Sequence, residues 1–388
     1  MNRRKILIAG ASVLGAGAAG LGWHAVRRGV FSSGAGPAYA AWKQWPPLPE
    51  EGAKGLVRAA VLAASPHNTQ PWLFRISDSR IDLLADPTRN LGAIDPFLRE
   101  MHMGLGCALE NLVLGARAAG YRTALTLFPA GPDAVHVAAL QLDSGEPDAS
   151  PLFAAIPHRH TNRGAYDPVR PVGQEVLKAM GALGLDLPDV TVLWFTSEAQ
   201  RDGIGELIVA ATQAIIADGQ QSADSARWLR MSWDKVQHHR DGITLDAAGL
   251  PPLVRGAAKM LPELSHEESD AAWLKATRET HVATAMGYGL LVARRAHDSV
   301  QRLQGGRLWQ RMHLWAAGHA LAVQPLNQIP ERADREASLG IEPVFGAALR
   351  DLVGDPAWEA LMPFRIGYPV RAALPSPRRA VEDVLLKD

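Results

Sequence analysis

Four arginines in two short motifs have the chemistry needed to hold a phosphate group. Arg159 and Arg163 flank the hydroxyl donor Thr161, and Arg378 and Arg379 are neighbours near the carboxyl end. A planar guanidinium group donates two parallel hydrogen bonds to one phosphate. The two motifs are therefore candidates for an anion clamp. The alternative is that all four arginines are solvated surface charges.

A proline-bounded turn is the second polar motif. Ser65-Pro66-His67-Asn68-Thr69-Gln70-Pro71 follows a short helical pattern over 55–64 and precedes an expected strand over 72–76. Two prolines and an asparagine favour a rigid turn. Ser65 and Asn68 offer hydrogen-bonding groups to a ligand. The alternative is a plain Asx-type turn in front of a strand.

Other chemistries have weaker support. The 13 histidines form no HExxH or carboxylate-paired spacing, so we expect no metal site. The chain lacks the G-x-S-x-G motif of a serine hydrolase. Its one cysteine, Cys107, excludes an intrachain disulfide and a thiolate metal cage. Forty basic residues balance forty acidic ones, which leaves no electrostatic footprint for nucleic acid.

The first forty residues are typical of an export signal. Asn2-Arg3-Arg4-Lys5 precedes an uncharged run over 6–23, and Ala38-Tyr39-Ala40 follows a Ser/Gly/Pro stretch. A basic start, an apolar middle and an A-x-A exit describe a secretory signal, and the arginine pair resembles a twin-arginine signal. The alternative is an uncleaved membrane anchor, which would tether the protein through its N-terminus. We expect an exported, periplasmic body over the remaining residues.

The rest of the sequence predicts an α+β protein of two related halves, 41–150 and 151–388. An amphipathic pattern over 98–120 predicts a long helix, and strands are expected at 81–85, 121–128 and 134–141. A helix, a turn and a strand then recur at 174–182, 185–189 and 190–196. Further helices are expected at 199–218, 270–303 and 307–321, and residues 219–268 look irregular and rich in His, Trp and Pro.

Four segments resemble motifs of the nitroreductase-family flavoproteins. The turn over 64–72 resembles their Ser-x-x-Asn-x-Gln-Pro-Trp turn, and 108–114 resembles their central helix. Arg159-His160-Thr161-Asn162-Arg163 resembles their Arg-x-Ser-x-Arg/Lys signature. Phe364-Arg365-Ile366-Gly367-Tyr368-Pro369 and Ser376-Pro377-Arg378-Arg379 look like their last strand and basic clamp.

The order of these motifs departs from the family pattern. In the family the Arg element comes first, and a homodimer binds two FMN molecules at its interface. Here the first half has the turn and the second half has the Arg element, while 185–189 stands where a second turn would be. This order is similar to the Acg-like subgroup, whose single chain mimics the dimer. The resemblance implies a nitroreductase-like fold, a tandem intrachain pseudo-dimer with one composite flavin site, and a monomer or weak homodimer.

The same resemblance implies FMN as cofactor and assigns residues to it. It places Arg159 and Arg163 near the phosphate or flavin N1, one of Arg378 and Arg379 at the phosphate, and 324–327 against the flavin near N5. No catalytic residue is named, because the flavin itself carries the chemistry. The cofactor-binding residues implied are Ser65, Pro66, Asn68, Arg159, His160, Thr161, Arg163, Gln324, Pro325, Leu326, Asn327, Arg378 and Arg379.

Two classes of function follow from this resemblance. The first is an FMN-dependent oxidoreductase that reduces nitro or quinone-like small molecules by two-electron, ping-pong chemistry. Its electron donor would be NAD(P)H or, after export, a periplasmic or membrane donor. The second is a non-catalytic protein that binds or sequesters FMN under a lid formed by 219–268. The segment 219–268 could also be an ordinary surface loop. A third possible function is that of an anchored structural protein without a ligand.

Overall fold

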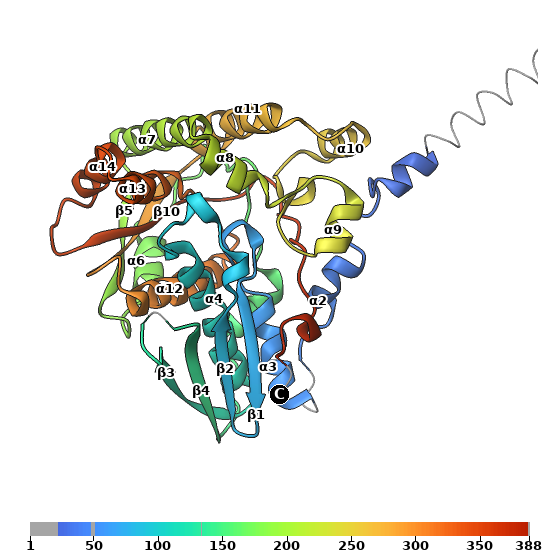
Figure 1. Ribbon diagram of the computed structural model, residues 1–388, viewed down its shortest axis with the longest axis vertical. Coiled ribbons are helices and arrows are strands. Elements are labelled where there is room, and N and C mark those ends of the chain that lie inside the picture. Colours follow the sequence, from blue (N-terminus) through green and yellow to red (C-terminus); the bar gives the residue numbers. More distant parts are fainter. Residues whose placement is uncertain (1–21, 48–50, 133, 387–388) are drawn as a thin grey trace, which may run out of the picture.

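The computed structural model describes residues 22–47, 51–132 and 134–386. Two antiparallel four-stranded sheets and the helices packed against them form the body of the molecule (Figure 1). The predicted α+β class is therefore confirmed. The arginine pair and most of the uncharged run of the predicted signal lie outside the described residues.

The first sheet is made by residues of the first predicted half. Its order is β1 (Trp72–Ser77), β2 (Arg80–Ala85), β4 (His136–Ser144) and β3 (Tyr121–Leu127). In β1, Trp72 and Phe74 are fully buried, as expected for alternate side chains on the core side of a sheet. Residues at the carboxyl end of the chain return to this sheet, because Phe74 N donates to Val384 O at 2.8 Å.

The second sheet has the same strand order and the same antiparallel pairing. It consists of β5 (Val190–Phe195), β8 (Gly287–Ala293), β10 (Glu359–Gly367) and β9 (Ala322–Pro325). In both sheets one long helix joins the second strand to the third. These helices are α4 (Arg99–Ala118) and α12 (Ser299–Gly318).

The central helices α4 and α12 lie against each other through small residues. A Cβ atom at Gly106 would lie 2.1 Å from Leu303 O, and one at Gly306 would lie 2.0 Å from Met103 O. The contact is thus reciprocal between the two helices. Only glycine permits this distance, since either methyl group would overlap the facing backbone. The helix that the sequence predicted at 98–120 is α4, and it holds the two halves of the core together.

The remaining helices surround these two layers. Figure 1 shows α7 and α11 along one side of the molecule, with α13 and α14 packed next to α7. The α-helices not yet named are α2 (Ala40–Lys43), α3 (Gly52–Val61), α5 (Pro151–Ala155), α6 (Gln174–Ala182), α7 (Glu198–Ala217), α8 (Gly219–Ala226), α9 (Trp233–His239), α10 (Pro252–Met260), α11 (His266–Ala276), α13 (Gln328–Leu339) and α14 (Val344–Val353).

Short elements complete the chain. The two-residue strands β6 (Leu229–Arg230) and β7 (Ile243–Thr244) pair in parallel. A π-helical turn spans Thr277–Val282, and the 3-10 turns are Pro37–Tyr39, Pro66–Asn68, Pro87–Arg89, Gly92–Ile94, Ile156–His158, Leu245–Ala247 and Val381–Asp383. Among the described residues, no helix is both long and apolar enough to cross a membrane.

Two expectations about secondary structure were wrong. The segment 270–303 is not one helical region, because it contains the fully buried strand β8 between α11 and α12. A strand buried on both faces loses the alternation that distinguishes it from a helix. The segment 219–268 is not irregular, since it forms α8, α9, α10 and the small β6–β7 pair.

Candidate functional site

Arg159 and Arg378 meet at the end of α3. Arg159 Nη2 donates to Leu62 O at 3.2 Å, and Arg378 Nη2 donates to Ala63 O at 3.0 Å. These consecutive carbonyls follow the carboxyl end of α3, where the helix dipole favours positive charge. Both arginines are buried, at 2% and 3% exposure. Arginines from two motifs that are distant in the sequence therefore lie next to each other here.

The two guanidinium groups carry buried charge without a matching carboxylate. Neither makes a salt bridge with an acidic residue in the described part of the chain, and the Nε atom of each is buried without a hydrogen-bond partner. Burial lowers the pKa of Arg159 to about 10. Burial, followed by the charge of Arg159, lowers the pKa of Arg378 well below its ordinary value. An anion placed here would relieve both effects.

The turn over 65–70 positions Asn68 beside Arg378. Asn68 Oδ1 accepts from Arg378 Nη1 at 2.6 Å, and Asn68 Nδ2 donates to Pro377 O at 3.0 Å. Ser65 Oγ accepts from Gln70 N at 3.0 Å and so closes the turn. Pro66 packs against α4, where a Cβ on Gly104 would come within 2.9 Å of its ring. Asn68 belongs to the arginine cluster, whereas Ser65 and Pro66 shape the turn.

His160 lies in the same cluster, next to an aromatic residue that sequence reasoning missed. Its ring meets Trp42 edge-on at 4.6 Å, and the Arg378 guanidinium lies 4.7 Å from the centre of the Trp42 ring. Burial, followed by the charge of Arg159, lowers the pKa of His160 to about 3, so the imidazole is neutral at ordinary pH. Trp42 escaped notice because it directly follows the segment interpreted as an export signal.

His313 of α12 is a second missed residue. Its Nδ1 lies 3.3 Å from Arg159 Nη1, and its Nε2 is buried without a partner. Burial, followed by the charge of Arg159, lowers the pKa of His313 well below its ordinary value. No motif marks His313. It lies near the carboxyl end of a helix with a mixed polar pattern, which gave no signal.

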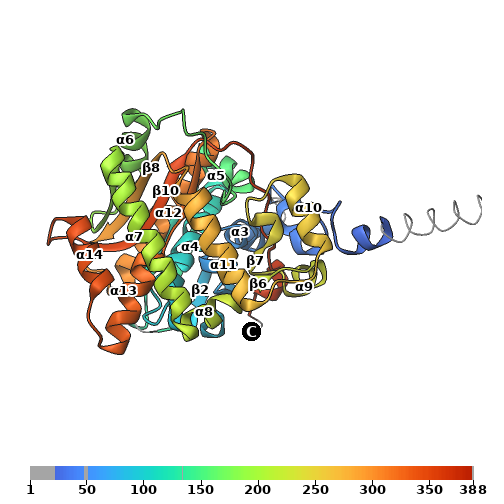
Figure 2. The same ribbon diagram turned by 90° about the horizontal axis from the view of Figure 1, so that it is seen from above.

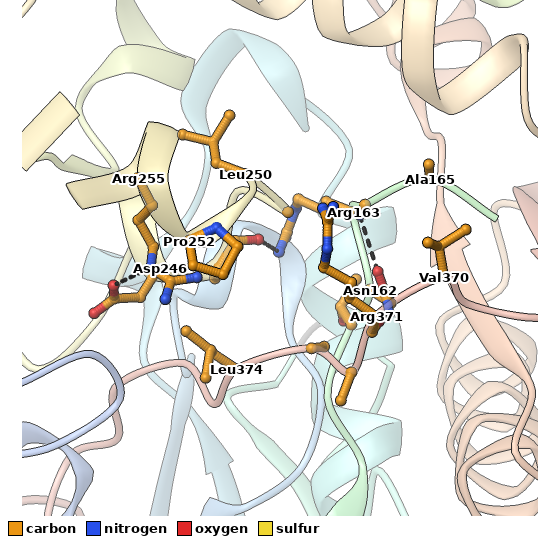
Figure 3. A pocket seen from close by; sticks show the side chains of 16 residues that line it. Asn162, Arg163, Ala165, Asp246, Leu250, Pro252, Arg255, Val370, Arg371 and Leu374 are labelled. Carbon is orange, nitrogen blue, oxygen red and sulfur yellow. Dashed lines mark hydrogen bonds and ion pairs between the residues drawn. The ribbon is translucent and has the colours of Figure 1, made fainter. Parts of the chain in front are cut away.

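The other residues of the Arg element face a cavity of about 260 Å³ (Figure 3). Thr161 and Arg163 line one side, residues 246–255 line another, and residues 370–374 complete it. Arg163 Nη1 donates to Ala247 O at 3.2 Å. Burial lowers the pKa of Arg163 to about 10. Thr161 and Arg163 are thus brought to one pocket, next to a segment that sequence reasoning had considered as a lid.

Gly249 brings that segment against the Arg element. Its φ is +77°, and a Cβ there would lie 2.3 Å from the backbone nitrogen of Gly164. A side chain at this position would therefore collide with backbone while occupying a left-handed conformation. The same segment also contacts the turn, because Asn68 Nδ2 donates to Gly242 O at 3.3 Å and Gln70 Nε2 donates to Arg240 O at 2.9 Å.

Arg365 of β10 links a third predicted segment to the site. Its Nη2 donates to Gly164 O at 2.7 Å, and its Nε donates to Gln324 Oε1 at 2.8 Å. Arg365 is fully buried, and burial lowers its pKa. From the sequence, Arg365 is recognisable only as part of a strand motif. Its role in joining Gln324 to the Arg element is visible only in the structure.

The remaining predicted residues lie apart from the two arginines. Leu326 is buried, its backbone nitrogen donating to Pro363 O at 2.9 Å, and Asn327 precedes α13 with a buried Oδ1 that has no partner. In the described part of the chain, no hydrogen bond joins Pro325, Leu326 or Asn327 to Arg159. The Arg379 guanidinium bonds elsewhere than Arg378, because its Nη1 donates to Gln70 O at 3.3 Å and its Nη2 donates to Asp383 O at 2.7 Å.

Metal ligands are sparse around this site. Within the part of the chain that the structure describes, no group of three or more His, Cys, Asp or Glu residues could hold a metal ion. The cluster instead combines arginines, neutral histidines, an amide and an indole. This combination suits an anionic, aromatic ligand rather than a cation.

Known proteins of similar sequence include proteins named nitroreductases. No family model matches the chain. The chain is 27% identical over 344 residues to a Mycobacterium tuberculosis protein named "Putative NAD(P)H nitroreductase Rv3131", which corresponds to 86% of this chain and 91% of the relative. This similarity supports the nitroreductase family. A second M. tuberculosis relative, "Putative NAD(P)H nitroreductase acg", is 32% identical over 93 residues, 24% of this chain and 28% of that one.

Solved nitroreductase structures are more distant. The FMN-dependent nitroreductase NfnB from Mycobacterium smegmatis, solved with NADPH, is 16% identical, with a TM-score of 0.37 over 61% of this chain and 98% of that one. An FMN- and NADPH-dependent NfnB from a Sphingopyxis strain is 17% identical, with a TM-score of 0.39 over the same shares.

Proposed function

We propose that this protein is an FMN-dependent oxidoreductase of the nitroreductase type, acting on small nitro or quinone-like acceptors. The observation that carries the proposal is the pair of buried arginines without carboxylate partners, Arg159 and Arg378. Each keeps one buried N–H group free of any partner. A phosphate would accept from those groups and neutralise the buried charge. The relatives whose names include NAD(P)H nitroreductase agree with this activity.

The residues present fit FMN, and we assign them as follows. Arg159 and Arg378 would hold the phosphate, with Asn68 fixing Arg378. Thr161 and Arg163 would face the remainder of the cofactor from the cavity wall. Bound FMN would supply the exchange of two electrons, and the protein would supply binding, orientation and electrostatics.

We further propose that the two halves, 41–150 and 151–388, form a tandem pseudo-dimer with one composite site. Three observations support it: the equal strand order of the two sheets, the reciprocal contacts of α4 and α12, and the return of the carboxyl end to β1. The site draws Asn68 from one half and Arg159 from the other. A single chain would then suffice, as a monomer or weak homodimer.

We propose export by the twin-arginine-type signal, with the uncharged run over 6–23 acting as a membrane tether if it is not removed. In the periplasm the donor would be a membrane or periplasmic reductant. NAD(P)H, which the relatives' names specify, is the donor to test first.

A second candidate function has its own support. Residues 240–255 touch both the turn and Arg163, through hydrogen bonds from Asn68, Gln70 and Arg163. A segment held this way could act as a lid that keeps donors and acceptors from the flavin. The protein would then bind or sequester FMN without turnover.

An absorption spectrum separates these functions. Purified full-length protein is examined before and after anaerobic addition of NADPH and then of dithionite. Flavin absorption that bleaches with NADPH supports the oxidoreductase. Flavin that bleaches only with dithionite favours a sequestering protein or another donor. Protein that takes up no FMN contradicts both.

A double variant tests the site itself, with a matched control. Arg159→Ala with Arg163→Ala should lose FMN, because the phosphate loses its charge-assisted hydrogen bond from Arg159 and the rest of the cofactor loses Arg163. Arg379→Ala removes a neighbouring arginine that faces Asp383, and should keep FMN. A double variant with full flavin content would refute the assignment.

A further inference from the structure

Helix α10 turns an apolar face away from the protein. Leu253, Val254 and Leu261 are 89%, 52% and 63% exposed, and the exposed residue Ala257 lies between them. Positions 253, 254, 257 and 261 share one side of a helix. A surface helix normally buries such a stripe and exposes its polar side.

The opposite side of α10 is polar and faces inward. Lys259 is buried, with its Nζ 2.7 Å from the Asp246 carboxylate. Arg255 lies 3.5 Å from the same carboxylate and lines the cavity together with Pro252. The helix is therefore inverted, with its charges inside and its apolar side chains outside. Such an inversion costs stability in water unless something covers the apolar side.

A second exposed apolar group lies beside α10. Trp23, Val26 and Phe31 are 62%, 61% and 76% exposed. Lys259 Nζ donates to Gly29 O at 2.9 Å, which fixes this segment against α10. Figures 1 and 2 both place the first described helix next to α10 at the same end of the molecule. We call the combined surface the α10 face, made of Trp23, Val26, Phe31, Leu253, Val254, Ala257 and Leu261.

We propose that the α10 face docks on the surface of a lipid bilayer. The sequence directly before it, over 6–23, carries no charged residue and ends at Trp23. The Arg27 guanidinium lies 4.9 Å from the centre of the Trp23 ring. Tryptophan and arginine at the border of an apolar surface are the side chains preferred where lipid headgroups meet the hydrocarbon. Docking would bring the cavity that α10 lines close to the membrane.

A site-specific fluorescent label tests the contact in the full-length protein. Cys107 is the one cysteine and is buried, so a thiol-reactive NBD dye would label Ala257→Cys selectively. Leu185→Cys is the matched control, because Leu185 is 85% exposed and follows α6, which Figure 1 shows on the opposite side of the molecule from α10. Vesicles of phosphatidylcholine with phosphatidylglycerol serve as the membrane. Emission from position 257 should shift to shorter wavelength on binding, and emission from position 185 should not.

Charged substitutions on the α10 face provide a second test of membrane docking. Leu253→Glu with Leu261→Glu should remove the spectral shift and weaken vesicle binding about tenfold or more, since apolar contacts are replaced by charges. Both positions are exposed, so folding should be unaffected. A vesicle-bound protein whose label at 257 behaves like the label at 185 would refute the docking surface. No vesicle binding at all would refute it too.

The proposal on docking is separable from the proposed function. Flavin absorbance is read on the same samples, and the variants at 253 and 261 should keep it because neither residue lines the cavity. Loss of flavin with retained docking would contradict the oxidoreductase alone. Retained flavin without the spectral shift would contradict the docking alone.

Discussion

The buried charge of Arg159 leads to a quantitative prediction about the ligand. Burial lowers the pKa of Arg159 from its ordinary value to about 10. That difference is between two and three pH units, or about 3 kcal/mol at roughly 1.4 kcal/mol per unit. A phosphate that restores the ordinary charge balance would recover a free energy of this order. We therefore expect FMN to bind about 100-fold more tightly than riboflavin, which lacks the phosphate.

Substitution of Arg159 provides the test. In Arg159→Met, a side chain of similar length without charge, the preference for FMN over riboflavin should fall to within a few-fold of unity. Riboflavin affinity itself should change little, because riboflavin has no group for Arg159 to hold. Both affinities are measured by quenching of flavin fluorescence on titration with apo-protein.

The control and the refuting results are distinct. The control is Arg379→Met, which removes the arginine next to Arg378, one that hydrogen-bonds Asp383 O. The preference of this variant for FMN over riboflavin should equal that of the unmodified protein. Equal affinities for FMN and riboflavin in the unmodified protein would refute the phosphate assignment. An unchanged preference in Arg159→Met would show that Arg159 does not contact the phosphate.

Three further predictions follow from the same structure. Burial lowers the pKa of His160 from near 6.5 to about 3, so the unfolded chain binds the extra proton and the free energy of unfolding should fall as pH drops from 6.5 towards 3. His160→Gln should make that slope shallower in pH-dependent melting curves, with the remainder due to other buried histidines such as His313, and an unchanged slope would contradict this. Gly306→Ala should destabilise the protein by about 3 kcal/mol or more, because its methyl group would meet Met103 O at 2.0 Å. Gly203→Ala, whose methyl group would have nothing within 4 Å, should be neutral or stabilising by up to about 1 kcal/mol. Equal melting temperatures of the two variants would refute the close contact between α4 and α12. A chain that starts at residue 41 loses the buried side chain of Tyr39, which should lower the free energy of unfolding by about 3–5 kcal/mol. It should therefore melt at a lower temperature and retain less FMN than a chain that starts at residue 22. Identical melting and flavin content would show that residues 22–40 are dispensable.

Much of the site could be predicted from residue type and local order. Guanidinium and hydroxyl groups bind phosphate, which made Arg159, Thr161 and Arg163 candidate ligands from their residue types alone. The turn containing Asn68 was recognisable because proline and asparagine restrict the backbone. The long helix α4 followed from its apolar periodicity, and the α+β class from the alternation of helix and strand patterns. These features depend on neighbours in sequence, so the sequence carries their signal.

Other features depend on where distant segments meet. Strand β8 was mistaken for helix because burial on both faces removes alternation. Trp42 and His313 reach the cluster from segments that look unrelated to it. Arg379, although it stands beside Arg378, instead hydrogen-bonds Gln70 O and Asp383 O. The position of an arginine in the sequence does not reveal whether its side chain is buried without an acidic partner.

The sequence by itself determined which groups can bind an anion and which local elements present them. The tertiary structure decided that Arg159 and Arg378 share the end of α3, and that residues 240–255 lie over the turn and Arg163. The physical reason is that burial, charge compensation and backbone contact are properties of packed surfaces. They exist only once segments more than 200 residues apart are in place.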